Sequence, residues 1–187
     1  MAITDLNISV FQFIFGLSHR NFFFDELGIF LAQYLPYLLV IGAIAFVFLF
    51  EDWKHRILLG IEGLLAAILA RGIVTELIRY FYHSPRPFVA LNLSPLVSES
   101  SWSFPSGHAM LFFALAMTIF YASRRLGAWY FAFAAINGLA RIFVGVHWPL
   151  DIIGGALLGI VSAMVVHALF EPLTRELQLQ MKRNESK

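Results

Sequence analysis

The chain alternates between long apolar stretches and short polar segments. Five stretches are apolar over enough residues to form spanning helices, because a helix needs about 20 residues to cross a bilayer. These stretches are residues 22–50, 56–82, 107–123, 126–146 and 149–170. Pro36 lies inside the first of them and predicts a bend in that helix. The pattern therefore predicts an all-α fold, a polytopic membrane helix bundle with five to six transmembrane helices.

A shorter apolar stretch precedes the first span. Residues 8–17 are too few to cross a bilayer, so we expect an N-terminal interfacial helix there. Three phenylalanines of this helix are candidates for facing lipid: Phe11, Phe13 and Phe15. The segment is not expected to be a signal peptide, because residues 1–7 lack a basic region and no small-residue cleavage site follows.

The composition supports a lipid environment for most of the protein surface. Hydrophobic residues make up 59% of the 187 residues and charged residues only 13%, whereas a soluble domain carries roughly a quarter charged residues. The net charge of +1 gives no reason to expect a nucleic-acid partner. The sequence has no cysteine, which excludes disulfides, thiol catalysis and cysteine-ligated metals. The length allows a single domain, which we expect to cover residues 1–187.

Basic residues near the span ends indicate how the bundle is oriented. They gather on one side, after the first, third and fifth spans: Lys54, Arg56, Arg124, Arg125, Arg175, Lys182, Arg183 and Lys187. The positive-inside rule makes this side cytoplasmic. The long Ser- and Pro-rich connection at residues 83–104 then lies on the outer face of the cell membrane, together with the N-terminal helix.

Polar segments at the outer span ends carry the chemistry. There are three: residues 79–87, 104–108 and 141–151. They hold Arg79, Arg86 and Arg141, which would repel one another unless an anion lay between them. Guanidinium groups stay charged and bind phosphate oxygens in pairs. Ser106 and Gly107 open a helix, where free backbone N–H groups favour an anion and glycine allows close approach. We therefore predict a phosphate site formed by these five residues.

Two histidines and an aspartate complete the predicted site. If the fifth span begins near residue 149, His147 and Asp151 lie four residues apart across its first turn, so their side chains meet. A carboxylate on one ring nitrogen leaves the other free to attack, so His147 is the candidate nucleophile and Asp151 its orienting partner. His108 is the candidate general acid and base. We expect no metal and no cofactor, because the arginines supply positive charge; the places of Glu76 and Glu99 stay open.

Taken together, the motifs resemble those of the type-2 phosphatidic acid phosphatase family, which also includes the vanadium haloperoxidases. The family pattern is Lys, six residues, Arg-Pro; then Pro-Ser-Gly-His; then Ser-Arg, five residues, His, three residues, Asp. Residues 79–87 match the first spacing with Arg79 in place of lysine, and residues 105–108 match the second. Residues 140–151 match the third, with Ala140 in place of serine. The resemblance implies the roles given above, and Arg79 differs from lysine in reach and geometry.

Several other polar residues match no motif. Three histidines are expected to be structural or interfacial: His19, His55 and His167. His83 is adjacent to the predicted site, and its contact with substrate is left open. Arg71 and Glu62 lie inside the second span, where charge is costly and often functional. We favour a structural role for them, as a pair or through Glu76 or Asn137.

The motifs predict a lipid phosphatase. Residues 15–19 and 30–37 add a likeness to the bacterial undecaprenyl diphosphate phosphatases of this family, so undecaprenyl diphosphate is the expected substrate. The alternatives are a phosphatidylglycerophosphate or phosphatidate phosphatase, and a lipid-phosphate transporter or binding protein. The transporter would explain the arginines but gives no reason for a His–Asp pair beside a second histidine. The pattern indicates no particular oligomeric state.

Overall fold

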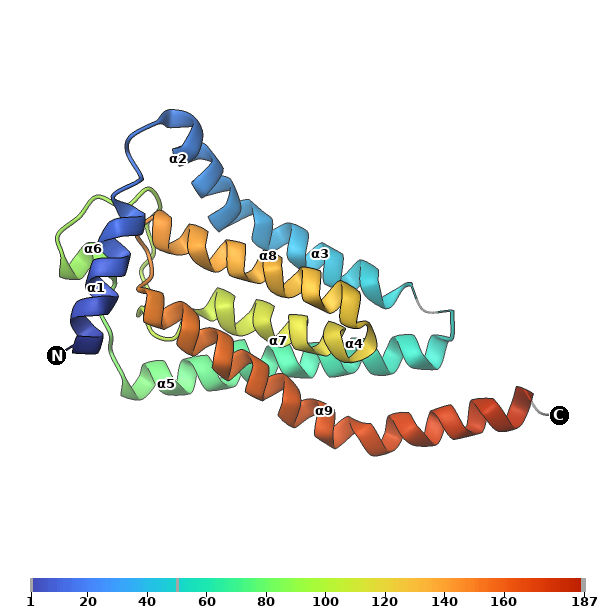
Figure 1. Cartoon of the computed structure of the whole chain (residues 1–187). Helices are drawn as coiled ribbons and strands as arrows, with labels where there is room; N and C mark the ends of the chain where they lie inside the picture. The colour runs from blue at the N-terminus through green and yellow to red at the C-terminus, as the bar shows by residue number, and fades with distance from the viewer. Residues whose placement is uncertain (1, 50, 186–187) are drawn as a thin grey trace.

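The computed structural model describes residues 2–49 and 51–185, and the regular elements within them are helices (Figure 1). In chain order they are α1 (Ala2–Phe15), α2 (Phe22–Ile29), η1 (Phe30–Tyr34), α3 (Leu35–Val47), α4 (Trp53–Ala67), η2 (Ile68–Val74), α5 (Thr75–Phe81), α6 (Pro87–Ala90), α7 (Gly107–Ala122), α8 (Arg124–Phe143) and α9 (Pro149–Glu185). The elements η1 and η2 are π-helical turns that join the helices on either side of them. The predicted all-α fold is confirmed.

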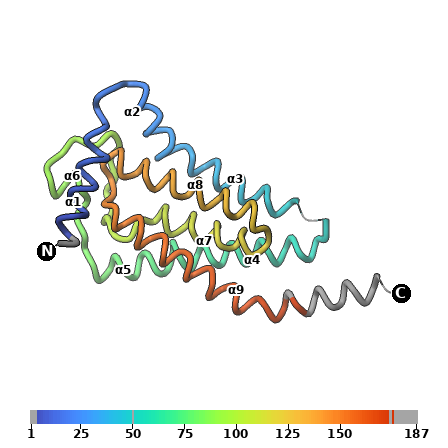
Figure 2. The backbone as a smooth tube through the Cα atoms, viewed as in Figure 1, coloured from blue at the N-terminus to red at the C-terminus, as the bar shows by residue number. Residues whose placement is uncertain are grey.

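The helices include all five predicted spans. Four helical segments are long and apolar enough to cross a membrane: Phe22–Val47, Trp53–Phe81, Arg124–Phe143 and Pro149–Leu173. The fifth, α7, is apolar but has only 16 residues. It lies in the middle of the bundle, packed against α4, α8 and α9 (Figure 2). The last helix does not end at residue 170, because α9 continues through Pro172 into the polar tail.

Small residues hold α9 against α7. Gly155 and Gly159 lie one turn apart on α9. A methyl group at Gly159 would lie 2.4 Å from the carbonyl oxygen of Met110, and one at Gly155 would lie 2.8 Å from that of Ser106. Such backbone contact is typical of membrane helices that pair through small residues. The helix that begins near His147 is thereby fixed against the helix that begins at Ser106.

Hydrogen bonds from side chains to backbone carbonyls fasten α8 to the first span. Pro36 lies in the first turn of α3, directly after the π-helical turn η1. Having no N–H, it leaves the preceding π-helical turn without one donor. Nδ2 of Asn137 donates to the carbonyl of Leu31 at 2.7 Å, and Nη1 of Arg141 donates to that of Ala32 at 3.4 Å. The irregularity predicted at Pro36 therefore leaves a carbonyl free for α8.

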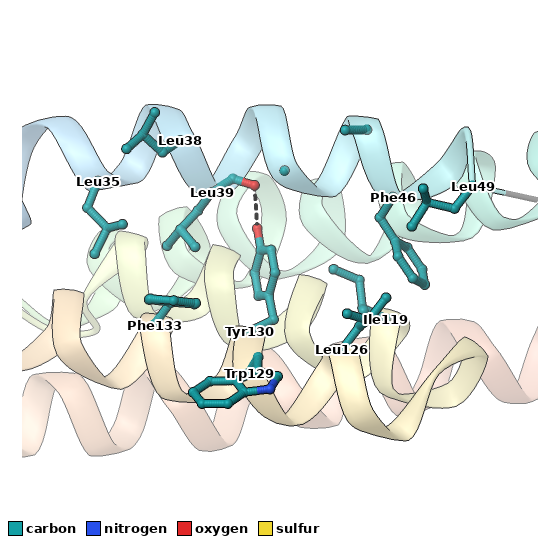
Figure 3. Close-up of a pocket in the computed structure, with 12 residues that line it drawn as sticks. Leu35, Leu38, Leu39, Phe46, Leu49, Ile119, Leu126, Trp129, Tyr130 and Phe133 are labelled. Atoms are coloured by element: carbon teal, nitrogen blue, oxygen red, sulfur yellow. Dashed lines mark hydrogen bonds between the residues drawn. The ribbon is translucent and has the colours of Figure 1, made fainter.

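A groove of about 480 Å³ runs between α3 and α8, nearer the end of the bundle away from the motifs (Figure 3). Its lining is predominantly apolar, with leucines from α3 facing aromatic side chains of α8. The hydroxyl of Tyr130 donates to the carbonyl of Leu39 at 2.8 Å and ties the two helices together. The groove suits hydrocarbon rather than a phosphate group, so the polar chemistry must lie elsewhere.

α1 lies across one end of the bundle rather than along it (Figure 1). Phe11 is 0% exposed and packs against Trp148, with ring centroids 5.1 Å apart, and against Ile142 of α8. The prediction that Phe11 faces lipid is therefore wrong, because this face of α1 covers the bundle end. Phe13 is exposed, as predicted, and Phe15 is half-buried in a stack with Phe11.

The three motif segments meet at the end of the bundle that α1 covers (Figures 1 and 2). The end of α5, the start of α7 and the junction of α8 with α9 all lie there. The start of α4 with Lys54 and the junction of α7 with α8 lie at the other end, as does the C-terminal part of α9. The bundle therefore separates the motif end from the end where the basic residues gather.

Candidate active site

A glycine-dependent turn carries the chain from α8 into the site. Gly145, two residues after the end of α8, has a left-handed backbone with a φ of +89°. Its N–H donates to the carbonyl of Ile142 at 3.0 Å, and the N–H of Val146 donates to that of Arg141 at 3.1 Å. These two bonds form a Schellman cap, whose left-handed position favours glycine. The cap sets the spacing between Arg141 and His147, so the two side chains stay at the same end of the bundle.

Asp151 is held in the first turn of α9 by three groups that meet at one carboxylate oxygen. Its Oδ2 accepts from the backbone N–H of Trp148 at 2.8 Å and from the hydroxyl of Ser103 at 2.5 Å. The same oxygen lies 3.3 Å from Nδ1 of His147. A carboxylate at this helix position commonly reaches back to the residue before the helix. Because Nδ1 faces the carboxylate, Nε2 of His147 is left with the free lone pair.

Arg86 joins two of the motif segments from the loop before α6. Its Nε donates to the carbonyl of Ser101 and its Nη1 to that of Val146, each at 2.7 Å. Nη1 also lies 3.4 Å from Nε2 of His147. Burial lowers the pKa of Arg86 to about 10, although Glu99 opposes the shift, so the guanidinium keeps its charge at neutral pH. A cation therefore stands beside the free nitrogen of His147.

Ser106 begins α7 as its N-cap and is fully buried. Its N–H donates to the carbonyl of Asp151 at 3.1 Å, which joins the starts of α7 and α9. Gly107 and His108 follow in the first turn, where the N–H groups of a helix start favour an anion. Gly107 and His108 therefore lie at the end of the bundle that also holds Arg141 and Asp151.

Arg79 turns into the protein at the end of α5. It is 6% exposed, and its Nη2 donates to the carbonyl of Pro105 at 3.0 Å, one residue before the α7 cap. Its Nη1 lies 3.4 Å from the hydroxyl of Ser101. Because it is buried, Arg79 does not simply extend toward the membrane surface, as many arginines at span ends do. Within the described part of the chain, the buried Nε atoms of Arg79 and Arg141 have no hydrogen-bond partner, and an oxyanion would supply one.

Glu99, in the loop between α6 and α7, lies between two of the arginines. Its Oε1 accepts from Nη2 of Arg141, and its Oε2 accepts from Nη2 of Arg86 at 3.0 Å. Burial alone would raise the pKa of Glu99, but Arg141 and Arg86 outweigh it, so the pKa lies below its usual value. The ionised carboxylate thus forms ion pairs with Arg86 and Arg141, two of the arginines that were predicted to bind phosphate.

His147 is held in the uncharged form. Burial, followed by the positive charges of Arg141 and Arg86, keeps the pKa of its imidazole well below the usual range. Its side chain is 1% exposed. A neutral imidazole keeps a lone pair on Nε2, so the nearby cations favour the form that can act as a nucleophile at neutral pH.

The sequence profile of the PAP2 superfamily matches residues 62–175, more than half of the chain, and this range contains all three motifs. The chain belongs to the PAP2 superfamily. The resemblance drawn from the motifs is confirmed. With its spanning helices, this PAP2 protein is a membrane phosphatase.

The chain is also similar to named bacterial membrane proteins. The chain is 34% identical over 168 residues to the bacitracin transport permease protein BcrC of Bacillus licheniformis, covering 89% of this chain and 81% of that one. It is 31% identical over 159 residues to the undecaprenyl-diphosphatase BcrC of Bacillus subtilis (strain 168), covering 83% and 80%. It is 28% identical over 152 residues to the phosphatidylglycerophosphatase B of the same strain, covering 75% and 70%.

Solved structures share the PAP2 fold. The crystal structure of Aquifex aeolicus LpxE superposes with a TM-score of 0.65 at 28% identity, covering 86% of this chain and 94% of that one. The first transmembrane PAP2-type phosphatidylglycerolphosphate phosphatase from Bacillus subtilis superposes with a TM-score of 0.68 at 22% identity, covering 91% and 87%. The predicted membrane helix bundle is therefore the fold of known transmembrane PAP2 phosphatases.

Two polar residues of the PAP2 site were not assigned from the sequence. Glu99 was left open as a metal ligand, and it pairs with arginines instead. Ser103 was not singled out, yet its buried hydroxyl bonds Asp151. Both lie in residues 83–104, the one long connection recognised from the sequence, and this position between two motifs was the available signal.

Glu62 and Arg71, both inside the second span, do not pair with each other. Oε1 of Glu62 lies 2.8 Å from Nδ1 of His167, whose ring stacks on Tyr121 with centroids 3.6 Å apart. Nη1 of Arg71 lies 2.7 Å from Oε1 of Glu76, which was one of the two partners expected for it. Glu62 therefore joins three helices far from the motifs, whereas Arg71 points toward the site end.

The remaining histidines contact structural partners. The ring of His83 packs beside Trp102 with centroids 4.7 Å apart. Nε2 of His19 lies 3.1 Å from the carbonyl oxygen of Ser94, so it ties the end of α1 to the long loop. His55 lies in the first turn of α4, at the other end of the bundle. Of these, only His83 lies in a motif segment.

The position of Glu99 predicts competition between its carboxylate and a bound anion. In the variant Glu99→Gln, orthovanadate should inhibit about tenfold more tightly, a change of ~1.4 kcal/mol, because no charge has to be displaced from Arg86 and Arg141. Without vanadate the variant should unfold at a lower temperature, since two buried cations lose their partner. The measurements are the vanadate inhibition constant and the thermal midpoint in detergent.

The control is Glu171→Gln, which removes an exposed carboxylate paired with Arg175 at the other end of the bundle. It should change neither quantity. An unchanged or weaker vanadate affinity in Glu99→Gln would show that Glu99 does not occupy the anion site.

Proposed function

We propose that this PAP2 phosphatase hydrolyses undecaprenyl diphosphate to undecaprenyl phosphate through a phosphohistidine intermediate. The observation that carries the mechanism is the orientation of His147. Its Nδ1 lies 3.3 Å from Oδ2 of Asp151, and its Nε2 lies 3.4 Å from Nη1 of Arg86. The nitrogen that can attack phosphorus therefore faces a cation suited to hold a phosphate.

In the first step, Nε2 of His147 attacks the terminal phosphorus of the diphosphate. The P–N bond forms as the bond from phosphorus to the bridging oxygen breaks, and the electron pair stays on that oxygen. His108 donates a proton to the leaving oxygen as general acid. Arg79, Arg86 and Arg141 stabilise the charge on the equatorial oxygens of the transferring group.

In the second step, His108 takes a proton from water, and the resulting hydroxide attacks the phosphorus of the phosphohistidine. The P–N bond breaks, its electron pair returns to His147, and inorganic phosphate leaves. Asp151 stabilises the imidazole in both steps because it accepts the hydrogen on Nδ1. The hydroxyl of Ser106 and the backbone N–H of Gly107, in the first turn of α7, contribute further donors to the phosphate oxygens.

The arginines take the part that a metal ion plays in many phosphatases. Phosphoryl transfer needs positive charge on the equatorial oxygens, and either cations or metal ions can provide it. Three guanidinium groups already surround this site. Within the described residues, no group of three or more histidine, aspartate or glutamate side chains has the arrangement of a metal site. We therefore propose a reaction that needs no metal and no cofactor.

The choice of substrate rests on the relatives and on the shape of the outer end. One relative is named an undecaprenyl-diphosphatase and matches 83% of this chain. Apart from α1, the outer end carries mainly the loop between α6 and α7, and most of the chain is helix, so little protein stands above the bundle to enclose a large soluble substrate. A cluster of arginines also suits the dense charge of a diphosphate.

A phosphatidylglycerophosphate or phosphatidate phosphatase is the second candidate. The 28% identity to a phosphatidylglycerophosphatase favours it, because the same phosphate site accepts a monoester. A lipid-phosphate transporter is less suited to the geometry. Holding a headgroup needs cations, but it does not need a buried histidine fixed by a carboxylate.

We also propose that the site faces the outside of the cell. The basic residues at the other end of the bundle favour a cytoplasmic position for that end. The chain has no cysteine, so single cysteines report on sidedness directly. In intact cells a membrane-impermeant thiol reagent should label Ser98→Cys, in the α6–α7 loop, but not Lys54→Cys at the start of α4. The reverse pattern would place the active site on the cytoplasmic face.

The proposed mechanism predicts distinct losses for the two histidines. His147→Ala should abolish both turnover and the acid-labile phosphoenzyme, because no nucleophile remains. His108→Ala should slow turnover ~100-fold or more, as the loss of general acid–base catalysis does. The control His55→Ala, at the other end of the bundle, should behave as wild type. A chelator should leave the rate unchanged, and a loss of activity that magnesium restores would contradict the metal-free mechanism.

The substrate assignment predicts the outcome of a competition. With undecaprenyl diphosphate, phosphatidylglycerophosphate and phosphatidate offered together, kcat/KM should be at least about tenfold higher for the diphosphate, or ~1.4 kcal/mol. The measurement is release of each product from mixed micelles by purified protein. A preference for either glycerolipid would overturn the substrate but not the histidine mechanism.

A further inference from the structure

Arg71 is a charged residue inside a spanning segment, and it lies on the π-helical turn η2. Within this turn, both the N–H and the hydroxyl of Thr75 donate to the carbonyl of Ala70, five residues earlier. A wider turn of this kind changes which side chains share a face, and π-helical turns are frequent at functional sites. A charged side chain inside a membrane span costs free energy unless polar or charged groups contact it.

The side chain of Arg71 lies against the start of α7. A methyl group on Gly107 would lie 2.5 Å from Nε of Arg71 and 2.8 Å from its Cδ. Only glycine leaves room for the guanidinium at that distance. Arg71 therefore sits directly beside the backbone between Ser106 and His108, which is part of the proposed phosphate site.

Arg71 and Arg79 share one carboxylate. Oε1 of Glu76 lies 2.7 Å from Nη1 of Arg71 and 3.8 Å from Nη1 of Arg79. The Arg79 side chain is 7% exposed, whereas those of Arg71 and Glu76 are 44% and 57% exposed. One negative charge therefore faces two positive charges, and the Arg71 side of the cluster is open. Because Glu76 is shared by two arginines, an anion that reaches the open side of Arg71 can compete with this carboxylate.

A diphosphate ester needs more cationic contacts than a monoester. Its terminal phosphate occupies Arg86 and Arg141 in the proposed function, on which this inference rests. Its ester-linked phosphate carries its own charge and gains more when the bridging bond breaks, because it becomes the leaving group. That second charge requires a cation next to the first site but outside it, on an open side.

We propose that Arg71 binds the ester-linked phosphate of a diphosphate substrate and gives the enzyme its preference for diphosphates over monoesters. Arg71 suits this role because it borders Gly107 and its guanidinium has an open side. Its ion-pair partner, Glu76, is shared with Arg79. The competing explanation is that Arg71 and Glu76 simply neutralise each other within the membrane.

The experiment compares two lipids with the same tail, diacylglycerol diphosphate and phosphatidate, in detergent micelles. Arg71→Gln should lower kcat/KM for the diphosphate about 10- to 100-fold and leave that for phosphatidate within about twofold. Only the diphosphate has a second phosphate group that loses its contact with Arg71. Arg71→Lys should restore part of the diphosphate activity. Glu76→Gln, which releases the Arg71 guanidinium, should not reproduce the loss.

The matched control is Arg175→Gln, which breaks an exposed arginine–glutamate pair at the other end of the bundle. It should alter neither substrate. A second measurement is independent of turnover: methylenediphosphonate should raise the thermal midpoint of wild type more than that of Arg71→Gln, and orthovanadate should raise both equally.

The outcomes separate this inference from the proposed function. Equal losses on both lipids, or the same loss in Glu76→Gln, would show a structural ion pair and overturn the role of Arg71. Unchanged diphosphate hydrolysis in Arg71→Gln would also overturn it. A wild-type enzyme that hydrolyses no lipid diphosphate would overturn the proposed function itself, before any variant is compared.

Discussion

The mutual repulsion of buried guanidinium groups governs the motif end of this bundle. Arg79, Arg86 and Arg141 are each less than a tenth exposed, and charges removed from water destabilise a fold unless they are neutralised. Backbone carbonyls take several of their N–H groups, and the carboxylate of Glu99 accepts from two of the three. Two Nε atoms are left over in the described chain. An anion bound there would complete the neutralisation, which fits the proposed phosphate site and the proposed catalytic pair beside it.

Local geometry explains which parts of this site could be predicted. The spacing of His147 and Asp151 is one helical turn, and that of Arg141 and His147 follows from a cap at Gly145, so short-range rules suffice. Glu99 and Ser103 gain their roles from partners 42 and 48 residues away, which no local pattern records. Phe11 was misjudged for the same reason, because the helices it covers are distant in the sequence. The positions of the spans could be predicted from hydropathy along the sequence. The packing of α4, α8 and α9 around α7 could not, because it depends on contacts between distant residues.

The departures from regular helix lie beside arginines that are costly to place inside a membrane protein. Pro36 removes one hydrogen bond from the first span, and side chains of α8 donate to the nearby carbonyls of Leu31 and Ala32. A second π-helical turn lies in the next span and carries Arg71 to the start of α7. In a bilayer each freed backbone group must find a partner within the protein. Such departures are therefore tolerated where other side chains bond the freed backbone groups.

The carboxylate of Glu99, which pairs with Arg86 and Arg141, would compete with dissolved anions for these two arginines. A tethered group competes at an effective concentration that is roughly millimolar for short flexible links. In the proposed site, free phosphate below that concentration would not displace Glu99 from Arg86 and Arg141. A lipid headgroup confined to the membrane plane would reach a higher local concentration. In the proposed function, Glu99 would therefore favour membrane-anchored phosphates over soluble ones.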